Sequence, residues 1–212
     1  GRLGRKHAEN IHYRMPNAEL IAISSIVPEE LVEVQQQMQP KQVTLDYREL
    51  LKNPELDAVV IATNSQSHCQ MIIEACEAGV KHIFTEKPMG MTLEEIDKIK
   101  EVMARHPEVI FQVGYNRRFD NSYQVAQAKI AAGFIGKPIL IKMINRDPAA
   151  MAEFIVKFSP TSGGLVMDML THDYDMARWL VGSDAQTIFG VGGVYAYEGL
   201  AAVGDIDNCG IL

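Results

Sequence analysis

Cysteine is scarce in this chain of 212 residues, with only Cys69, Cys76 and Cys209 present. So small and scattered a set excludes a disulfide framework. Cys69 and Cys76 lie seven residues apart on a helical pattern, which indicates buried thiols rather than metal ligands. The sequence also lacks a run of about 18 apolar residues and a signal-peptide pattern, so it indicates neither a membrane-spanning nor a secreted protein. We therefore expect a cytoplasmic location.

An excess of basic residues is also absent. Lys and Arg number 20 against 27 Asp and Glu, which gives a net charge of −7. This balance argues against a protein that coats nucleic acid, although a phosphate site built from backbone N–H groups stays open. Hydrophobic residues make up 47% of the chain, and a chain of this length buries roughly 70% of its unfolded surface without needing disulfides.

The first half of the sequence alternates short apolar runs with helical patterns. The run at residues 56–62 is apolar throughout, as in a parallel strand covered on both faces. A capping box opens the helix that begins at Thr92, and Gly79 is a natural helix end. This rhythm predicts a doubly wound parallel sheet, a Rossmann domain, over residues 1–118. We expect strands at residues 18–26, 56–62, 80–85 and 109–115, with helices at 6–13, 29–39, 67–78 and 92–105.

The pattern changes in the second half, where residues 139–145 alternate apolar and polar side chains. Such alternation is typical of an antiparallel strand with one covered face. We expect an α+β domain with an open, mostly antiparallel sheet over residues 119–212. Its predicted helices lie at residues 122–132 and 164–181, and its strands at 139–145, 186–196 and from about Asn208.

Both ends of the sequence predict a fragment of a longer chain. The glycine turn at residues 1–4 feeds a helix, but no strand precedes it. The last residues, 209–212, fall within an expected strand. We therefore expect a Rossmann domain that lacks its first strand and a second domain that is incomplete at its C-terminus.

The opening Gly1-Arg2-Leu3-Gly4 matches two thirds of the G-x-G-x-x-G fingerprint of dinucleotide-binding proteins. Glycines there allow a tight turn and close approach of the backbone to a pyrophosphate. The alternative is an ordinary glycine turn. An acidic residue usually ends the second strand of such folds and binds the adenosine ribose, but here Ser25 occupies that position. The sequence therefore leaves NAD and NADP both open, with NAD as the first expectation.

Polar side chains follow the buried strand at residues 56–62. In an open α/β sheet this loop lies at the carboxyl end, where ligands bind. Thr63, Asn64 and His68 are therefore candidates for cofactor binding. The alternative is a turn in which Ser65 or Ser67 caps the next helix.

Glu86, Lys87 and Pro88 end the next expected strand at the same edge of the sheet. A lysine there could hydrogen-bond a substrate hydroxyl and stabilise charge as the hydroxyl becomes a carbonyl. Pro88 fixes the following loop, and a cis peptide is an option. The alternative is a surface lysine beside a turn proline.

Asp168 and His172 are four residues apart on the expected helix at 164–181, and so share a face. A histidine with a carboxylate one turn away can act as an oriented general base. The alternatives are a satisfied core histidine and half of a metal site. Because no third ligand at suitable spacing accompanies the pair, we expect no metal.

These motifs together resemble the glucose-fructose oxidoreductase/inositol dehydrogenase/rhizopine-catabolism (Gfo/Idh/MocA) family of NAD(P)-dependent dehydrogenases. The order of the motifs along the chain is specific, although each alone is weak. Within the family the sequence looks most similar to inositol 2-dehydrogenases. The residues that carry the resemblance are 1–7, 86–88, 113–120, 145–148 and 163–173.

The resemblance implies roles for individual residues. It places Lys87, Asp168 and His172 around the reacting hydroxyl, with His172 as the general base. It implies that Arg117 contacts the substrate or the nicotinamide, and that Asp147 contacts the substrate. The implied cofactor-binding set is Gly1, Arg2, Leu3, Gly4, Ser25, Thr63, Asn64, His68, Glu86, Lys87 and Arg117.

The implied reaction is hydride transfer between a secondary alcohol of a polyol, cyclitol or sugar and NAD or NADP. The resemblance also implies a homodimer or homotetramer formed through the sheet of the second domain. The alternatives are a non-catalytic dinucleotide-binding regulator and a sister activity of the family, such as an aldose dehydrogenase. The sequence predicts no nucleic-acid or membrane partner.

Overall fold

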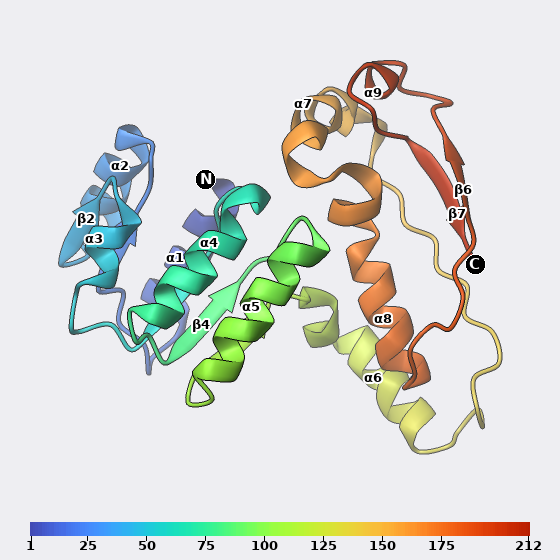
Figure 1. Ribbon diagram of the computed structural model, residues 1–212, viewed down its shortest axis with the longest axis horizontal. Helices are drawn as coiled ribbons and strands as arrows, with labels where there is room; N and C mark the ends of the chain where they lie inside the picture. The colour runs from blue at the N-terminus through green and yellow to red at the C-terminus, as the bar shows by residue number, and fades with distance from the viewer. The chain divides into compact units, whose positions relative to one another are not determined.

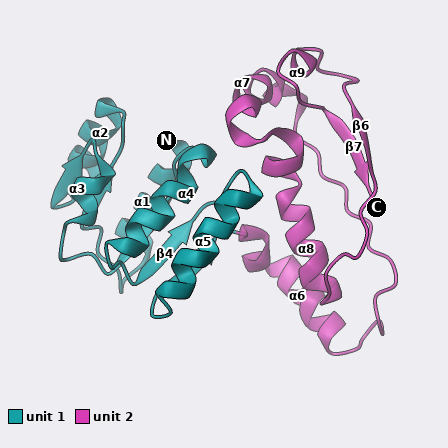
Figure 2. Cartoon of the chain, viewed as in Figure 1, with its two compact units in different colours: residues 1–114 teal, residues 115–212 magenta.

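The computed structural model describes all residues from 1 to 212. The chain divides into two compact units, residues Gly1–Gly114 and Tyr115–Leu212 (Figure 2). We call them the first unit and the second unit.

The first unit contains five strands in two parallel sheets. β1 (Ala22–Ser24) pairs with β2 (Gln42–Thr44), and β4 (His82–Thr85) lies between β3 (Ala58–Ile61) and β5 (Ile110–Val113). The parallel Rossmann-type arrangement is confirmed, and each of the four expected strands is present in a shorter form. β2 was not expected from the sequence, because a strand of three residues is too short to show a pattern.

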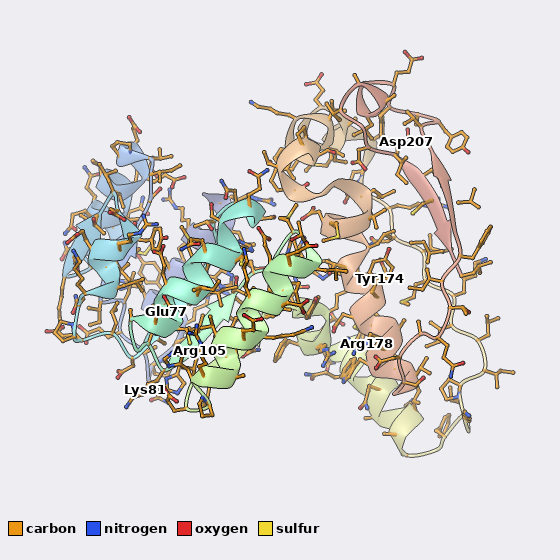
Figure 3. All side chains as sticks on the ribbon, viewed as in Figure 1. Glu77, Lys81, Arg105, Tyr174, Arg178 and Asp207 are labelled. Carbon is orange, nitrogen blue, oxygen red and sulfur yellow. The ribbon has the colours of Figure 1, made fainter.

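Five helices complete the first unit: α1 (Arg2–Arg14), α2 (Pro28–Met38), α3 (Tyr47–Leu51), α4 (Ser65–Glu77) and α5 (Leu93–Arg105). α4 and α5 run side by side next to β4 (Figure 1). On their outer surface Arg105 of α5 lies 3.6 Å from Glu77 of α4, near Lys81 (Figure 3). The expected cap of α5 is confirmed, because the Thr92 side chain accepts a hydrogen bond from the Glu95 N–H.

The core of the first unit lies between the three-stranded sheet and the pair α4 and α5. Ile72, Ile83 and Ile99 are among its most buried side chains. Cys69 and Cys76 belong to the same cluster, which confirms that they are buried thiols. Loss of hydration on burial raises the pKa of both thiols.

The second unit is mainly helical, with one small antiparallel sheet (Figure 1). The sheet pairs β6 (Gly190–Gly193) with β7 (Asn208–Ile211). Both strands lie where the sequence predicts them. The helical segments are η1 (Asn116–Phe119), α6 (Asn121–Ala131), η2 (Ala149–Met151), α7 (Ala152–Ser162), the π-helical turn η3 (Leu165–Met169), α8 (Thr171–Val181) and α9 (Gly199–Ala202).

Two expectations for the second unit are wrong. Residues 139–145 form no strand, since no neighbouring strand pairs with them and Ile139 and Leu140 are 97% and 83% exposed. The expected helix at 164–181 is not one continuous α-helix, because it begins with the π-helical turn. The sequence analysis assigned no element to residues 152–162, where the structure has α7 with Pro160 in its last turn.

No helix of the structure is both long enough and apolar enough to cross a bilayer.

Candidate functional site

The candidate cofactor residues of the first unit follow the carboxyl ends of its parallel strands. Ser25 directly follows β1, while Thr63 and Asn64 follow β3. Glu86 and Lys87 follow β4, which is hydrogen-bonded to β3 in register. Ligands of open α/β sheets bind at this edge.

The turn expected at residues 1–4 is not a separate element, because α1 begins at Arg2, with Gly1 as its N-cap and Gly4 in its first turn. A Cβ added at Gly1, the first residue of the given sequence, would meet no atom within 4 Å. A Cβ added at Gly4 would lie 3.5 Å from the Ala62 carbonyl oxygen and 3.7 Å from the Ala62 Cβ. A Cβ at Gly4 would thus make ordinary van der Waals contact with the end of β3, so α1 packs against this strand end without requiring a glycine.

His7 of α1 fixes the position of Glu86, the residue before Lys87. Its Nε2 lies 2.7 Å from Glu86 Oε1, and its ring meets the Phe84 ring edge to face at 5.3 Å. A Cβ at Gly114 would come within 2.9 Å of Phe84 and 3.1 Å of Glu86 Oε2, so a glycine is needed there. The sequence offered one signal for His7, its place in the family-like stretch 1–7.

Lys87 is half-buried, and its peptide bond to Pro88 is cis. His68 of α4 contacts the same loop. It is only 1% exposed and donates from Nδ1 to the Pro88 carbonyl at 2.7 Å. Its Nε2 lies 3.4 Å from the Thr63 carbonyl oxygen. The buried ring therefore joins the loops after β3 and β4 instead of presenting a surface to a ligand.

The residue that caps α4 is Asn64, not Ser65 or Ser67. Its Oδ1 accepts a hydrogen bond from the Ser67 N–H at 3.1 Å and a second one from the Ser67 hydroxyl. Its side-chain oxygen is thus engaged with the helix. Thr63 beside it is exposed.

In the second unit, Asp168 and His172 lie on a helical stretch that changes type between them. Asp168 is in the π-helical turn and His172 is the second residue of α8. The Leu170 N–H donates to the Leu165 carbonyl at 3.0 Å, five residues back. Both side chains are half-buried. Single π-helical turns inside α-helices are frequent at functional sites.

Asp205 anchors the start of this turn, a role that no sequence pattern indicated. Its Oδ2 accepts a hydrogen bond from the Ser159 hydroxyl at 2.7 Å. Both carboxylate oxygens lie 3.2–3.3 Å from the Leu165 nitrogen, which donates to them. A Cβ added at Gly164, where φ is +65°, would lie 2.4 Å from the carboxylate. Only a glycine therefore fits between Asp205 and the turn.

Asp173, the residue after His172, joins two candidate segments of the second unit. It accepts hydrogen bonds from Arg117 Nη1 at 2.8 Å and from Asn145 Nδ2 at 2.9 Å. Arg117 is thereby held beside the helix that carries His172. Asp147 is exposed, two residues after Asn145.

A second pair, Arg118 and Asp175, joins η1 to α8. Arg118 donates to both oxygens of the buried Asp175, at 2.8 and 2.6 Å, and its guanidinium lies 5.8 Å from the Trp179 ring centre. The hydrogen bonds to Asp175 raise the pKa of Arg118, and they outweigh the opposite effect of desolvation, which lowers it. This paired geometry fixes where η1 presents Arg117.

No three His, Cys, Asp or Glu side chains of the structure gather closely enough to hold a metal ion.

Comparison with known proteins places both units in one family. Residues 1–115 match the model of an oxidoreductase family with an NAD-binding Rossmann fold, and residues 123–212 match the Gfo/Idh/MocA C-terminal domain. The chain is 39% identical over 208 residues to the uncharacterized oxidoreductase YrbE of Bacillus subtilis, covering 98% of this chain and 59% of YrbE.

Two further relatives have names that state an activity. The scyllo-inositol 2-dehydrogenase (NAD(+)) of Bacillus subtilis is 39% identical over 209 residues, with 98% of this chain and 59% of that protein covered. A crystal structure of scyllo-inositol dehydrogenase from Lactobacillus casei, with bound NAD(H) and scyllo-inositol, matches with a TM-score of 0.93 and 38% identity. That match covers 100% of this chain and 63% of the solved one.

The chain thus spans about three fifths of the length of the relatives that it matches. Each unit matches its own family model, in the order N-terminal Rossmann domain and C-terminal domain. The chain therefore belongs to the Gfo/Idh/MocA family of oxidoreductases.

Proposed function

We propose that this protein is an NAD-dependent dehydrogenase that oxidises a secondary alcohol of an inositol-like cyclitol. The observation that carries the proposal is the carboxyl edge of the first unit. There Thr63 and Asn64 follow β3, and Lys87 follows β4, which pairs with β3 in a parallel sheet. The names of the relatives, which include an NAD(+) enzyme and a complex with NAD(H) and scyllo-inositol, support the choice of cofactor and substrate class.

The cofactor would be held by residues of the first unit. The N-terminus of α1, with Gly1 as its N-cap, suits the pyrophosphate. Ser25 lies where the adenosine ribose is bound in related folds. The remaining contacts that we propose from this unit come from Arg2, Leu3, Gly4, Thr63, Asn64, Glu86 and Lys87, with His68 joining the loops after β3 and β4. Arg117 of the second unit is a further proposed contact.

The bound nicotinamide supplies the hydride acceptor, and the protein supplies position and charge. His172 accepts the hydroxyl proton of the substrate as general base. Asp168 orients the His172 ring and stabilises its imidazolium form. Lys87 donates a hydrogen bond to the substrate oxygen and favours its change from hydroxyl to carbonyl.

Substrate contacts from the second unit would come from Arg117 and Asp147. The hydrogen bonds of Asp173 to Arg117 and Asn145 support this assignment, because they hold the guanidinium next to the His172 segment. A guanidinium fixed by one carboxylate keeps further N–H donors for substrate hydroxyls.

The experiment is a set of initial rates with myo-inositol, scyllo-inositol and glucose, each with NAD and with NADP. We expect turnover with an inositol and NAD. Binding of NADH without turnover of any polyol would favour a regulator, and turnover of glucose alone would favour an aldose dehydrogenase.

The base is tested by His172→Ala. General-base catalysis contributes about 10²–10⁴ in rate, so kcat should fall by that factor while the Kd for NADH changes by less than about threefold. His106→Ala, at an exposed ion pair with Glu108, is the control and should leave kcat unchanged. An unchanged kcat in the His172 variant would refute the assignment.

We also propose that copies of the chain associate through the β6–β7 sheet. Ile188, Phe189, Val191 and Tyr195, on or beside β6, are 58–76% exposed, a large apolar surface for a monomer. A solution mass equal to one chain would contradict this proposal.

A further inference from the structure

We propose that Glu30, held by the hydroxyl of Ser25, selects NAD over NADP. The inference rests on the proposed function, because it concerns the cofactor of that same site. The end of β1 has Ser25 where an acidic residue is usual, and we infer that Glu30, in the first turn of α2, supplies the carboxylate instead.

The position of Glu30 carries the proposal. Ser25 follows the last residue of β1, where dinucleotide folds usually place the acid that binds the adenosine ribose. The Ser25 hydroxyl donates to Glu30 Oε2 at 2.7 Å. Glu30 therefore brings a carboxylate to the carboxyl end of β1.

Ser25 and the start of α2 hold this carboxylate in place. The Val27 N–H donates to the Ser25 hydroxyl oxygen at 3.2 Å, which fixes the oxygen while its proton points to Glu30. The Glu30 side chain remains 37% exposed, so it is accessible to a ligand. The serine at the usual acidic position thus acts as a hydrogen-bond donor to an acid supplied five residues later.

The charge around Glu30 favours its ionised form. The hydrogen bond from Ser25 and the positive charge of Arg5 act to lower the pKa of the Glu30 carboxyl. Arg5, a cation close enough to contribute to that lowering, makes its own bonds to Glu33 and Gln37. Its guanidinium is thereby committed to α2 side chains, so it is poorly placed to bind a phosphate.

The two cofactors differ at the atom that this carboxylate would meet. The adenosine ribose of NAD presents two hydroxyls, which donate hydrogen bonds to a carboxylate. NADP carries a 2′-phosphate there, and placing its charge against Glu30 is repulsive. The same carboxylate therefore attracts one cofactor and rejects the other.

The test measures binding rather than turnover, using the fluorescence of NADH and NADPH titrated with the full chain. We expect the wild type to bind NADH at least about tenfold more tightly than NADPH. In Glu30→Gln the ratio of the two Kd values should fall by about tenfold, because NADH binding weakens and NADPH binding tightens. Glu29→Gln removes a charge from the same exposed helical turn without a bond to Ser25, and should leave the ratio within about twofold of the wild type.

A ratio that is unchanged in Glu30→Gln would overturn the proposal. Ser25→Ala provides a second, independent variant. Without the hydroxyl that orients the carboxylate, its ratio should move in the same direction by about threefold, and this variant decides the question if Glu30→Gln does not fold. If the wild type binds NADPH more tightly than NADH, the proposal is also wrong. A wild type that binds neither nucleotide would instead refute the proposed function itself.

Discussion

Replacing Gly164 by alanine should displace the carboxylate that anchors the π-helical turn. The added Cβ would lie 2.4 Å from the carboxylate of Asp205, well inside van der Waals contact. The backbone at Gly164, with φ of 65° and ψ of −160°, is also one that residues with a Cβ rarely adopt. Asp205 would have to move away from both the Ser159 hydroxyl and the Leu165 N–H.

The expected cost has two parts. Backbone strain at such a position costs about 1–3 kcal/mol. Each of the two hydrogen bonds that Asp205 loses contributes about 1–1.5 kcal/mol. Gly164→Ala should therefore lower the free energy of unfolding of the second unit by about 3–6 kcal/mol. Because Asp168 is three residues beyond Leu165, kcat should fall as well.

Urea denaturation followed by circular dichroism measures the stability. Gly182→Ala is the matched control, since Gly182 also has a positive φ, of 72°, but a Cβ there meets nothing within 4 Å. Its cost should be limited to about 1–2 kcal/mol of backbone strain. The Asp205→Ala background should reduce the cost of Gly164→Ala, because the clash is gone. The reasoning is refuted if Gly164→Ala is no more destabilising than Gly182→Ala, or if the two effects are simply additive.

Two further predictions concern carboxylates of the second unit. Asp173→Asn should release Arg117 and raise the KM for the polyol by about tenfold. Asp184→Asn, which breaks the exposed pair with Arg178, is the control and should not change KM. An equal KM in both variants would contradict the role of Asp173. Asp207, between α9 and β7 (Figure 3), accepts the N–H groups of residues 195–197, and although desolvation raises its pKa, these backbone bonds lower it overall. Its stabilising effect is present above the unfolded pKa of about 3.9 and is lost as the pH falls through the lower folded value. The stability difference between the wild type and Asp207→Asn should therefore shrink as the pH is lowered from 5 to about 2, as measured by urea denaturation, and a constant difference would show that the carboxylate charge is not responsible.

The elements that the sequence predicted well are those with local signals. The continuous apolar run at residues 56–62 and the capping box at Thr92 marked β3 and α5 within a few residues. The alternating pattern at residues 139–145 failed, because alternation records which side chains could be covered and not whether a partner strand exists. The sequence analysis assigned no helix to residues 152–162; the structure has α7 there, with Pro160 in its last turn.

The functional candidates divide in the same way. Sequence spacing identified Lys87, Asp168 and His172 as candidates, and the family resemblance gave them roles. Neither source indicated Asp205 or Glu30, and His7 entered only as part of the family-like stretch 1–7, without a role. The contacts of these residues depend on how the folded chain places them. Asp205 lies 40 residues from Leu165, and His7 lies 79 residues from Glu86.

The sequence by itself determined the family, the parallel order of the first unit and the residue types at the strand ends, because these depend on short periodicities and on motifs in a fixed order. Only the tertiary structure decided which side chains hold those residues in place. Asp205 accepts a hydrogen bond from Leu165 in the π-helical turn, Asp173 accepts one from Arg117, and Glu30 accepts one from Ser25. The physical reason is that a hydrogen bond between distant residues needs an ångström-scale approach, which no local pattern records. The need for a glycine at position 164, for example, becomes evident only once the position of the Asp205 carboxylate is known.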